Sequence, residues 1–437
     1  NFSREVIQQT FSGTVGKNRT INVTISRNGD LVHKLYLETP KSSSLNLENS
    51  TFNNPGHSMI DFVELEIGGQ TIDKIYGHWM EVWSRLSQPN ETCVTGLVDP
   101  IGNTPYLQAH SQGATVLHSS VSGASTSTGR ANSSGLTVMV PCTRYQKLAG
   151  GGGITTKHSD QKTVHAGTGF NDTTVPQLQV PLPFWFCKNP GLALPLIALQ
   201  YHEVKLKVKF SDLGFFLDSD PDVKVWAEYI YLDTPERRRF AQGTHEYLIE
   251  QLQRFDGVSS APSGTFCDAT LNLNFNHPVK ELVFSGDFYE NASTYGALPG
   301  IAYYGTKVTL KLNGHDRFSA DRRWNYFSKT QIYEHHTGPG NLYGGLEGVV
   351  SGESASGQDD MITLQKIDQI GVYSFALKPE EHQPSGTCNF SRIDSTRLTF
   401  NKLYSGDNGS AINLVVYAVN YNVLRIMSGM GGLAYSN

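Results

Sequence analysis

The sequence is poor in cysteine, in charge and in long apolar runs, and each shortage excludes a class of protein. Its five cysteines form no Cys-x-x-Cys pair, which argues against a disulfide framework or a zinc site and favours reduced thiols. They are Cys93, Cys142, Cys187, Cys267 and Cys388. No apolar run reaches about 18 residues, so we expect no membrane span. The net charge of −5 excludes a nucleic-acid binder that relies on bulk basicity.

The content of charged, aromatic and glycine residues is typical of an all-β protein. Charged residues make up 17% of the chain, aromatic residues 11%, and there are 43 glycines, so turns are frequent and apolar material is sufficient for packed cores. A chain of 437 residues is too long for one core. We therefore expect two domains of about 200 residues each.

The stretch Pro190–Phe210 contains the clearest strand signal in the chain. From Val204 to Phe210, four apolar residues alternate strictly with three lysines, which places the apolar set on one face of a strand and the lysines on the other. Simple solvation is the first interpretation of the lysines; protection of a sheet edge and contact with an acidic neighbour are the alternatives. These residues are Lys205, Lys207 and Lys209.

Four further local patterns carry expectations about structure. Asn28-Gly29 is a hairpin-type turn signal, and Gly68-Gly69 predicts a turn between two strands. The segment from about residue 88 to 180, rich in Ser, Thr and Gly, predicts long excursions outside the sandwich. Residues 233–250 predict a short helical connector, with Thr234 as N-cap, Pro235 at N1 and Gly243 dividing it into two pieces.

The second half of the chain repeats landmarks of the first in the same order. VELEIGGQTIDK resembles VTLKLNGHDRFS, LKVKF resembles TRLTF, and VKVWAEYIY loosely matches INLVVYAVN. An internal duplication with a longer loop in the first copy accounts for this order. Spacing alone therefore predicts two similar β domains.

Several longer motifs resemble those of one protein family. They are ISRNGDL, VELEIGGQTIDK, PGLALPLIALQYHEVKL, HEYLIEQLQ, LNFNHPVK, SFALKP, QPSGTCNFSRID and NYNVLRIMSGMGGLAY. Together they are similar to the major capsid protein of nucleocytoplasmic large DNA viruses, in particular the chlorella-virus type. The matched blocks extend over nearly the whole chain.

This resemblance implies a fold and a set of partners. The implied fold is all-β, with two consecutive eight-stranded antiparallel jelly rolls, long loops and short helices: residues 1–232, the connector 233–250, and residues 251–437. The implied function is structural, in a homotrimer of pseudo-hexagonal outline that tiles the icosahedral shell of a virion assembled in the host cytoplasm. Its partners would be neighbouring capsomers and minor capsid proteins, with at most indirect contact with an internal membrane and no direct contact with nucleic acid.

Local motifs give no support to catalysis, a cofactor or a metal ion. GMGGLA near the C-terminus lacks the following helix that a dinucleotide site needs. Asp218, Asp220 and Asp222 are spaced like calcium ligands, but the glycine and glutamate of an EF-hand loop are missing. In a strand, adjacent His335 and His336 would point to opposite faces and could not easily share one ion. Arg237–Arg239 could bind phosphate or a neighbouring subunit, but we favour a solvated face of the connector.

Ten Asn-x-Ser/Thr triplets mark candidate glycosylation sites. They lie at Asn1, Asn18, Asn22, Asn49, Asn90, Asn132, Asn171, Asn291, Asn389 and Asn408. The resemblance implies glycans attached at sites other than these triplets, so we expect most of the ten to be unmodified. If any carries sugar, Asn132, Asn171 and Asn291, in loop-like sequence, are the expected acceptors.

Two other functions remain open at this point. An enzyme built on tandem jelly rolls, such as a glycan-processing hydrolase, would need converging carboxylates in a cleft. A secreted carbohydrate-binding sandwich would need a calcium site with an aromatic platform, and the unpaired cysteines argue against it. The structural interpretation predicts no catalytic residue and no cofactor.

Overall fold

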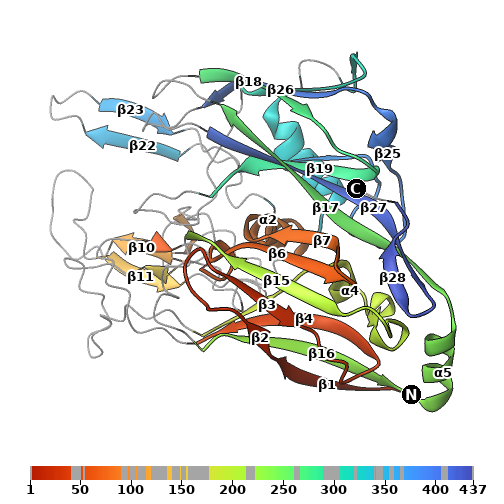
Figure 1. The fold of residues 1–437 in the computed structure, drawn as a ribbon. Helices are drawn as coiled ribbons and strands as arrows, with labels where there is room; N and C mark the ends of the chain where they lie inside the picture. The colour runs from red at the N-terminus through yellow and green to blue at the C-terminus, as the bar shows by residue number, and fades with distance from the viewer. Residues whose placement is uncertain are drawn as a thin grey trace.

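The structure is a computed structural model in which two β-sandwiches lie side by side (Figure 1). It describes the following residues: 2–40, 51–52, 55–89, 97–98, 105–106, 115–119, 135–139, 148, 154–155, 177–212, 222–259, 266–288, 305–318, 322–338, 340, 348–353, 359–364, 369–404 and 412–435.

The first sandwich is built from two antiparallel sheets. One has the order β1 (Phe2–Gln9), β16 (Lys224–Leu232), β4 (Leu31–Thr39), β13 (Leu178–Pro181), with the short β14 (Leu194–Pro195) also on β4. The other has the order β2 (Phe11–Ser12), β3 (Thr20–Thr24), β15 (Val204–Phe210), β6 (Ile60–Ile67), β7 (Gln70–Tyr76). Without the short β2 and β14, each sheet has four strands.

The second sandwich repeats this arrangement. One sheet has the order β17 (His245–Ser259), β27 (Ile412–Met427), β19 (Pro278–Gly286), β24 (Ile370–Ser374), with β25 (Cys388–Asn389) and β28 (Met430–Leu433) attached. The other has the order β18 (Phe266–Leu273), β26 (Thr396–Tyr404), β20 (Lys307–Leu312), β21 (His315–Asp316). Each of the eight main strands of one half therefore has a counterpart at the same sheet position in the other.

This correspondence confirms the predicted duplication. The motifs matched by spacing occupy equivalent strands: β6 and β20, β15 and β26, β16 and β27. The two halves are two consecutive eight-stranded jelly rolls, and jelly rolls limit the exposed sheet edges that favour unwanted pairing.

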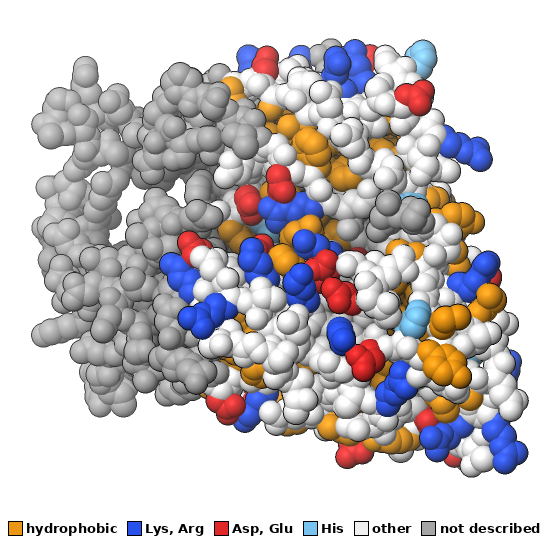
Figure 2. Space-filling view, viewed as in Figure 1, with side chains coloured by type: hydrophobic (Ala, Val, Ile, Leu, Met, Phe, Trp, Pro, Cys, Tyr) orange, Lys and Arg blue, Asp and Glu red, His pale blue; other side chains and the backbone are white. Residues whose placement is uncertain are grey.

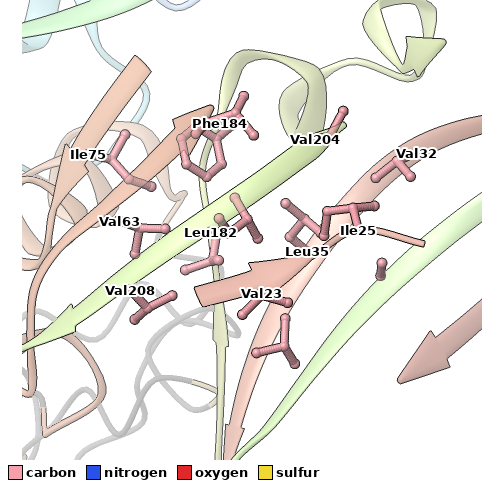
Figure 3. Close-up of a cluster of buried hydrophobic side chains, with 14 of the residues drawn as sticks. Val23, Ile25, Val32, Leu35, Val63, Ile75, Leu182, Phe184, Val204 and Val208 are labelled. Atoms are coloured by element: carbon pink, nitrogen blue, oxygen red, sulfur yellow. The ribbon is translucent and has the colours of Figure 1, made fainter. Parts of the chain in front are cut away.

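Strand β15 shows how the alternating pattern builds the first core. Leu206 is fully buried, and β15 lies between β3 and β6 rather than at an edge. Its apolar side chains meet those of the opposing sheet, as the close-up of Val204 and Val208 with Val32 and Leu35 shows (Figure 3). The strand assignment is confirmed, and the edge-protection alternative for the lysines is wrong.

The three lysines of β15 lie among carboxylates on the solvent face. Lys209 pairs with Asp61 at 2.7 Å and Lys205 with Glu203 at 3.0 Å. Lys207 lies 3.7 Å from the Glu64 carboxylate. On the face seen in Figure 2, acidic and basic side chains are interspersed rather than gathered by sign. Simple solvation, with weak ion pairs, describes these lysines.

One predicted turn is confirmed and another is wrong. Gly68 and Gly69, with φ of 59° and 83°, close the β6–β7 hairpin, because both turn positions need the left-handed backbone. Asn28-Gly29 does not form a hairpin: the strands on either side, β3 and β4, belong to opposite sheets. A Cβ at Gly29 would lie 2.7 Å from the Cβ of Tyr229, so glycine is required there for close approach.

The connector is shorter than predicted. Helix α5 (Thr234–Gln242) has Asp233, not Thr234, at its N-cap, and ends at Gly243, whose N–H donates to the Arg239 carbonyl at 3.0 Å. Residues 245–250 begin β17 and are not a second helical piece. Pairing with β27 over the full length of β17 outweighs their local helical pattern.

Two described strands of the predicted excursions, β10 (Thr115–Ser119) and β11 (Gly135–Met139), lie at the opposite end of the molecule from α5 (Figure 1). Within residues 88–180, the described strands before β13 include the hairpin of β10 and β11, a sheet of its own. The hairpin of β22 (Gly348–Glu353) and β23 (Asp359–Leu364) projects at the same end (Figure 1). Most of the Ser/Gly-rich segment lies outside the described residues.

Candidate functional site at the junction of the two sandwiches

Helix α2 (Gly77–Ser87) joins the two sandwiches. Ten of its eleven residues are buried. The helix begins at Gly77. Glycine is required at this position because a Cβ would lie 2.1 Å from the carbonyl oxygens of His57 and Ile60. Met80 packs into the first core. On another face, four apolar side chains at helical spacing pack on strands β19, β24 and β27 of the second sandwich; they are Trp79, Val82, Trp83 and Leu86.

Strands β17 and β27 cross the junction in the opposite direction. They have 15 and 16 residues, long for strands, and their paired ends reach the first sandwich. Ile249, Leu424 and Ile426 there belong to the first hydrophobic core. The two sandwiches are therefore joined by shared cores and not only by the α5 connector.

A buried ion cluster centres on Glu81 of α2. Its carboxylate accepts from Arg85 Nε at 2.7 Å and lies 2.8 Å from His57 Nδ1. Burial alone would raise the pKa of Glu81, but the Arg85 guanidinium and the His57 contact outweigh burial and lower it to about 2. Arg85 also donates to Gln369 of the second sandwich.

A second ion cluster links the sandwiches through Glu250 on β17. Lys188 of the first sandwich donates to Glu250 at 2.8 Å, and the fully buried Lys280 of β19 donates to its other oxygen. Burial would raise the pKa of Glu250, but the two ammonium groups lower it to about 2. Lys188 also lies over the ring of Trp83, 4.3 Å from its centroid.

Two further polar contacts cross the junction. Asp73 of β7 accepts from the Leu252 N–H of β17 at 3.2 Å, and burial raises its pKa to about 7. His78 of α2 contacts Tyr417 Oη at 2.9 Å and the Gly286 carbonyl at 2.8 Å. Burial lowers the pKa of His78, so the neutral ring donates from Nε2 and accepts at Nδ1.

The motifs considered in the sequence take structural positions. GMGGLA contains β28, which pairs with the end of β27, and His335 and His336 lie at the end of helix α6 (Gln331–His335), not in a strand. Asp222 pairs with Lys224 at 3.1 Å, while Asp218 and Asp220 lie outside the described residues. Asn132, Asn171 and Asn291 also lie outside them.

The arginines of the connector are exposed, as expected. No residue of α5 is buried, and Arg237 pairs with Asp30 at 2.8 Å. In the part of the chain that the structure describes, no group of three or more His, Cys, Asp or Glu side chains could hold a metal ion. None of the described helices is long and apolar enough to cross a membrane.

Comparisons with known proteins match both halves of the chain. The model for the major capsid protein N-terminus matches residues 1–101 and 152–233, and the model for large eukaryotic DNA virus major capsid proteins matches residues 236–341 and 365–432. The major capsid protein of Pyramimonas orientalis virus is 41% identical over 450 aligned residues, covering 100% of this chain and 91% of that protein. The chain belongs to the major capsid proteins of large eukaryotic DNA viruses.

Other members of the family support the same assignment. The major capsid protein of Paramecium bursaria Chlorella virus 1 is 34% identical, with 100% of this chain and 92% of that protein covered. A solved PBCV-1 virus capsid model matches with a TM-score of 0.69 and 30% identity, covering 100% of this chain and 97% of that one. This major capsid protein is therefore a structural component of the virion and not an enzyme.

The junction itself was not predicted from sequence. Trp79, Val82, Trp83 and Leu86 have the spacing of a helical apolar stripe, and this signal could have located α2. The ion clusters left no such signal, because Arg85 and Gln369 are 284 residues apart and Lys188 and Glu250 are 62 apart. The charges at the junction compensate one another. The junction therefore holds the two sandwiches in a fixed arrangement.

Proposed function

We propose that this major capsid protein forms homotrimers of pseudo-hexagonal outline that tile an icosahedral shell. The observation that supports this is the pairing of two sandwiches with the same strand order, joined by shared cores. Three such chains around one axis present six similar sides, which suits hexagonal packing. A heterologous contact, in which the second sandwich of one chain meets the first of the next, closes into a ring.

The junction gives each capsomer side a fixed orientation. If the sandwiches moved freely relative to each other, the six sides would not keep equal angles. Helix α2 and the paired ends of β17 and β27 restrict that motion, because each is buried in the core of the other sandwich or at the boundary. The proposed function therefore depends on the junction.

The proposal extends to domain boundaries and partners. Two units, residues 1–232 and residues 233 onward, are supported by the family models, whose matches end at 233 and begin at 236. Neighbouring capsomers and minor capsid proteins are the proposed partners, with only indirect contact with an internal membrane and no direct contact with nucleic acid. Assembly in the host cytoplasm is part of the same proposal.

The native mass of the purified chain tests the trimer. Light scattering behind a sizing column should give three times the chain mass of 48.1 kDa. The expected mass should persist on dilution, because capsomers are closed oligomers. A monomer at high protein concentration contradicts the proposal.

A further inference from the structure

The C-terminus of helix α2 is capped by a segment of the other sandwich. The last carbonyls of a helix have no partner within it and need donors from elsewhere. Here the N–H groups of Gly338 and Gly340 donate to the carbonyls of Leu86 at 2.7 Å and Arg85 at 2.9 Å. The Thr337 hydroxyl oxygen also lies 3.0 Å from the Ser87 carbonyl oxygen. Residues 336–338 and Gly340, which follow α6, thus cap a helix that belongs to the first sandwich.

His336 fixes this capping segment to the second sandwich. Its side chain is fully buried, with Nδ1 3.0 Å from Glu380 Oε1 and Nε2 3.1 Å from Glu281 Oε2. An ionised carboxylate offers no proton, so a neutral ring would turn a lone pair towards one of the two acids. The arrangement therefore favours the doubly protonated imidazolium.

Glu281 depends on that imidazolium for charge compensation. Its side chain is fully buried on β19, and neither carboxylate oxygen has a hydrogen-bond partner among the described residues. Its contact with His336 Nε2, at 3.1 Å, is an ion pair. A buried carboxylate without an opposite charge is strongly unfavourable.

Glu380 couples the same charge to the cap. It lies in the loop after β24 and accepts from the Thr337 N–H at 3.1 Å and the Thr337 hydroxyl at 2.7 Å. Burial would lower the pKa of His336, but Glu281 and Glu380 outweigh burial and raise it to about 9. The cap and the ion triad therefore share one residue pair, Glu380 and Thr337.

Other charged and titratable groups surround the triad. Trp83 of α2 presents its ring at a right angle to the imidazole, with centroids 6.3 Å apart. On β27, burial and then Glu250 and Glu281 raise the pKa of Tyr421 to about 12. The further groups on the packed elements are already paired or lie at the rim: Glu81 with Arg85, Lys280 with Glu250, His335 with Glu334, and Lys378 with Glu381.

We propose that residues 336–338 and Gly340 form a charge-dependent latch between the two sandwiches. The imidazolium of His336, held between Glu281 and Glu380, keeps the cap on helix α2. Loss of its proton leaves two facing carboxylates without a cation, and the cap separates from the helix.

The direction of the pH effect follows from the raised pKa. A group whose pKa is higher in the folded protein contributes stability that is fully present below its ordinary value of 6.5 and is lost as the pH rises through about 9. The latch is therefore closed at neutral pH and opens in alkali. In that range the lowered pKa of Glu380 and the raised pKa of Tyr421 keep both of those groups in one charge state.

Tryptophan fluorescence of the full chain tests the protonation step. A protonated imidazole quenches a neighbouring indole more than a neutral one, so Trp83 emission should rise with a midpoint near pH 9. Trp83→Phe should remove this change in emission, which identifies Trp83 as its source. His336→Gln should abolish the transition, and Glu281→Gln, which keeps the shape and removes one acid, should lower the midpoint by at least about one pH unit. A transition unchanged in both of these variants, or no transition in the wild type, overturns the proposal.

Trypsin digestion tests the opening of the cap. The Arg85 side chain is buried, so cleavage after it requires the end of α2 to loosen. Cleavage, corrected with a free peptide substrate at each pH, should accelerate several-fold from about pH 7.5 to about pH 9.5. Lys378→Gln, an exposed charge change in the loop that carries Glu380, is the matched control and should follow the wild type. Equal cleavage at both pH values contradicts the latch.

Discussion

The ring centroids of Trp79 and Tyr417 lie 4.9 Å apart, and the two residues belong to different sandwiches. Trp79 comes from helix α2 and Tyr417 from the centre of β27; both are buried. Tyr417 also bonds to His78 through its hydroxyl. One aromatic side chain of the second half thus contacts two successive residues of the helix supplied by the first.

Trp79→Ala should destabilise the whole chain and not one half. Removing a buried tryptophan costs about 3–5 kcal/mol, and here the cavity opens between the two sandwiches. Denaturant unfolding of the variant should show one cooperative transition, with its midpoint at a lower denaturant concentration than in the wild type. Tyr201→Ala, at a side chain that is 75% exposed, should change stability by less than about 0.5 kcal/mol. Two separate transitions in the wild type would show that the junction does not couple the sandwiches.

Leu206→Asp should unfold the first sandwich. A carboxylate would replace a fully buried side chain in the middle strand of the sheet, at a cost above about 4 kcal/mol. Lys205→Ser, on the solvent face of the same strand, should fold normally. Circular dichroism and melting temperature distinguish the two, and a normal melt for Leu206→Asp would mean that the facing of β15 is wrong.

Asp73→Asn should stabilise the chain above pH 7. The pKa of Asp73 is raised from 3.8 to about 7, so the folded state favours the protonated acid and loses stability as the pH rises between those values. Asparagine keeps the oxygen that accepts from Leu252 and removes the buried charge. The gain should be on the order of a few kcal/mol above pH 7 and close to zero near pH 4. Equal pH profiles for variant and wild type would contradict this.

Gly77→Ala should be costly although alanine favours helices. The added Cβ would lie 2.1 Å from two backbone carbonyl oxygens, so α2 would have to move away from His57 and Ile60. We expect a loss of at least about 2 kcal/mol in thermal unfolding. Gly191→Ala is the control, because its Cβ would meet only the Asn189 side chain, at 3.3 Å. An unchanged melting temperature for Gly77→Ala would disprove the steric argument.

Local patterns predicted the parts of the fold that short-range physics controls. The alternation in β15 and the glycine pair at 68 and 69 depend on neighbours in sequence, and the structure confirms both. The order of repeated landmarks predicted two similar β domains, and the family resemblance supplied the jelly-roll topology. Asn28-Gly29 misled because close packing against Tyr229, not a hairpin, requires that glycine.

The junction depends on long-range contacts, and sequence patterns do not report these. His245–Glu250 has a helical pattern, but pairing with β27 places it in a strand. Glu250 and Lys280 would be surface residues by composition, yet Lys280 is fully buried because Glu250 compensates its charge. Only the folded chain brings such partners together.

The shared ends of β17 and β27 determine where this protein can be divided. Helix α5 separates the sandwiches in sequence, but Ile249, Leu424 and Ile426 complete the core on the other side of it. A chimaera could join the first half of one relative to the second half of another at α5. Its first core would then contain residues from both parent proteins. An exchange of one jelly roll between relatives therefore requires these three positions to fit the first core of the other parent.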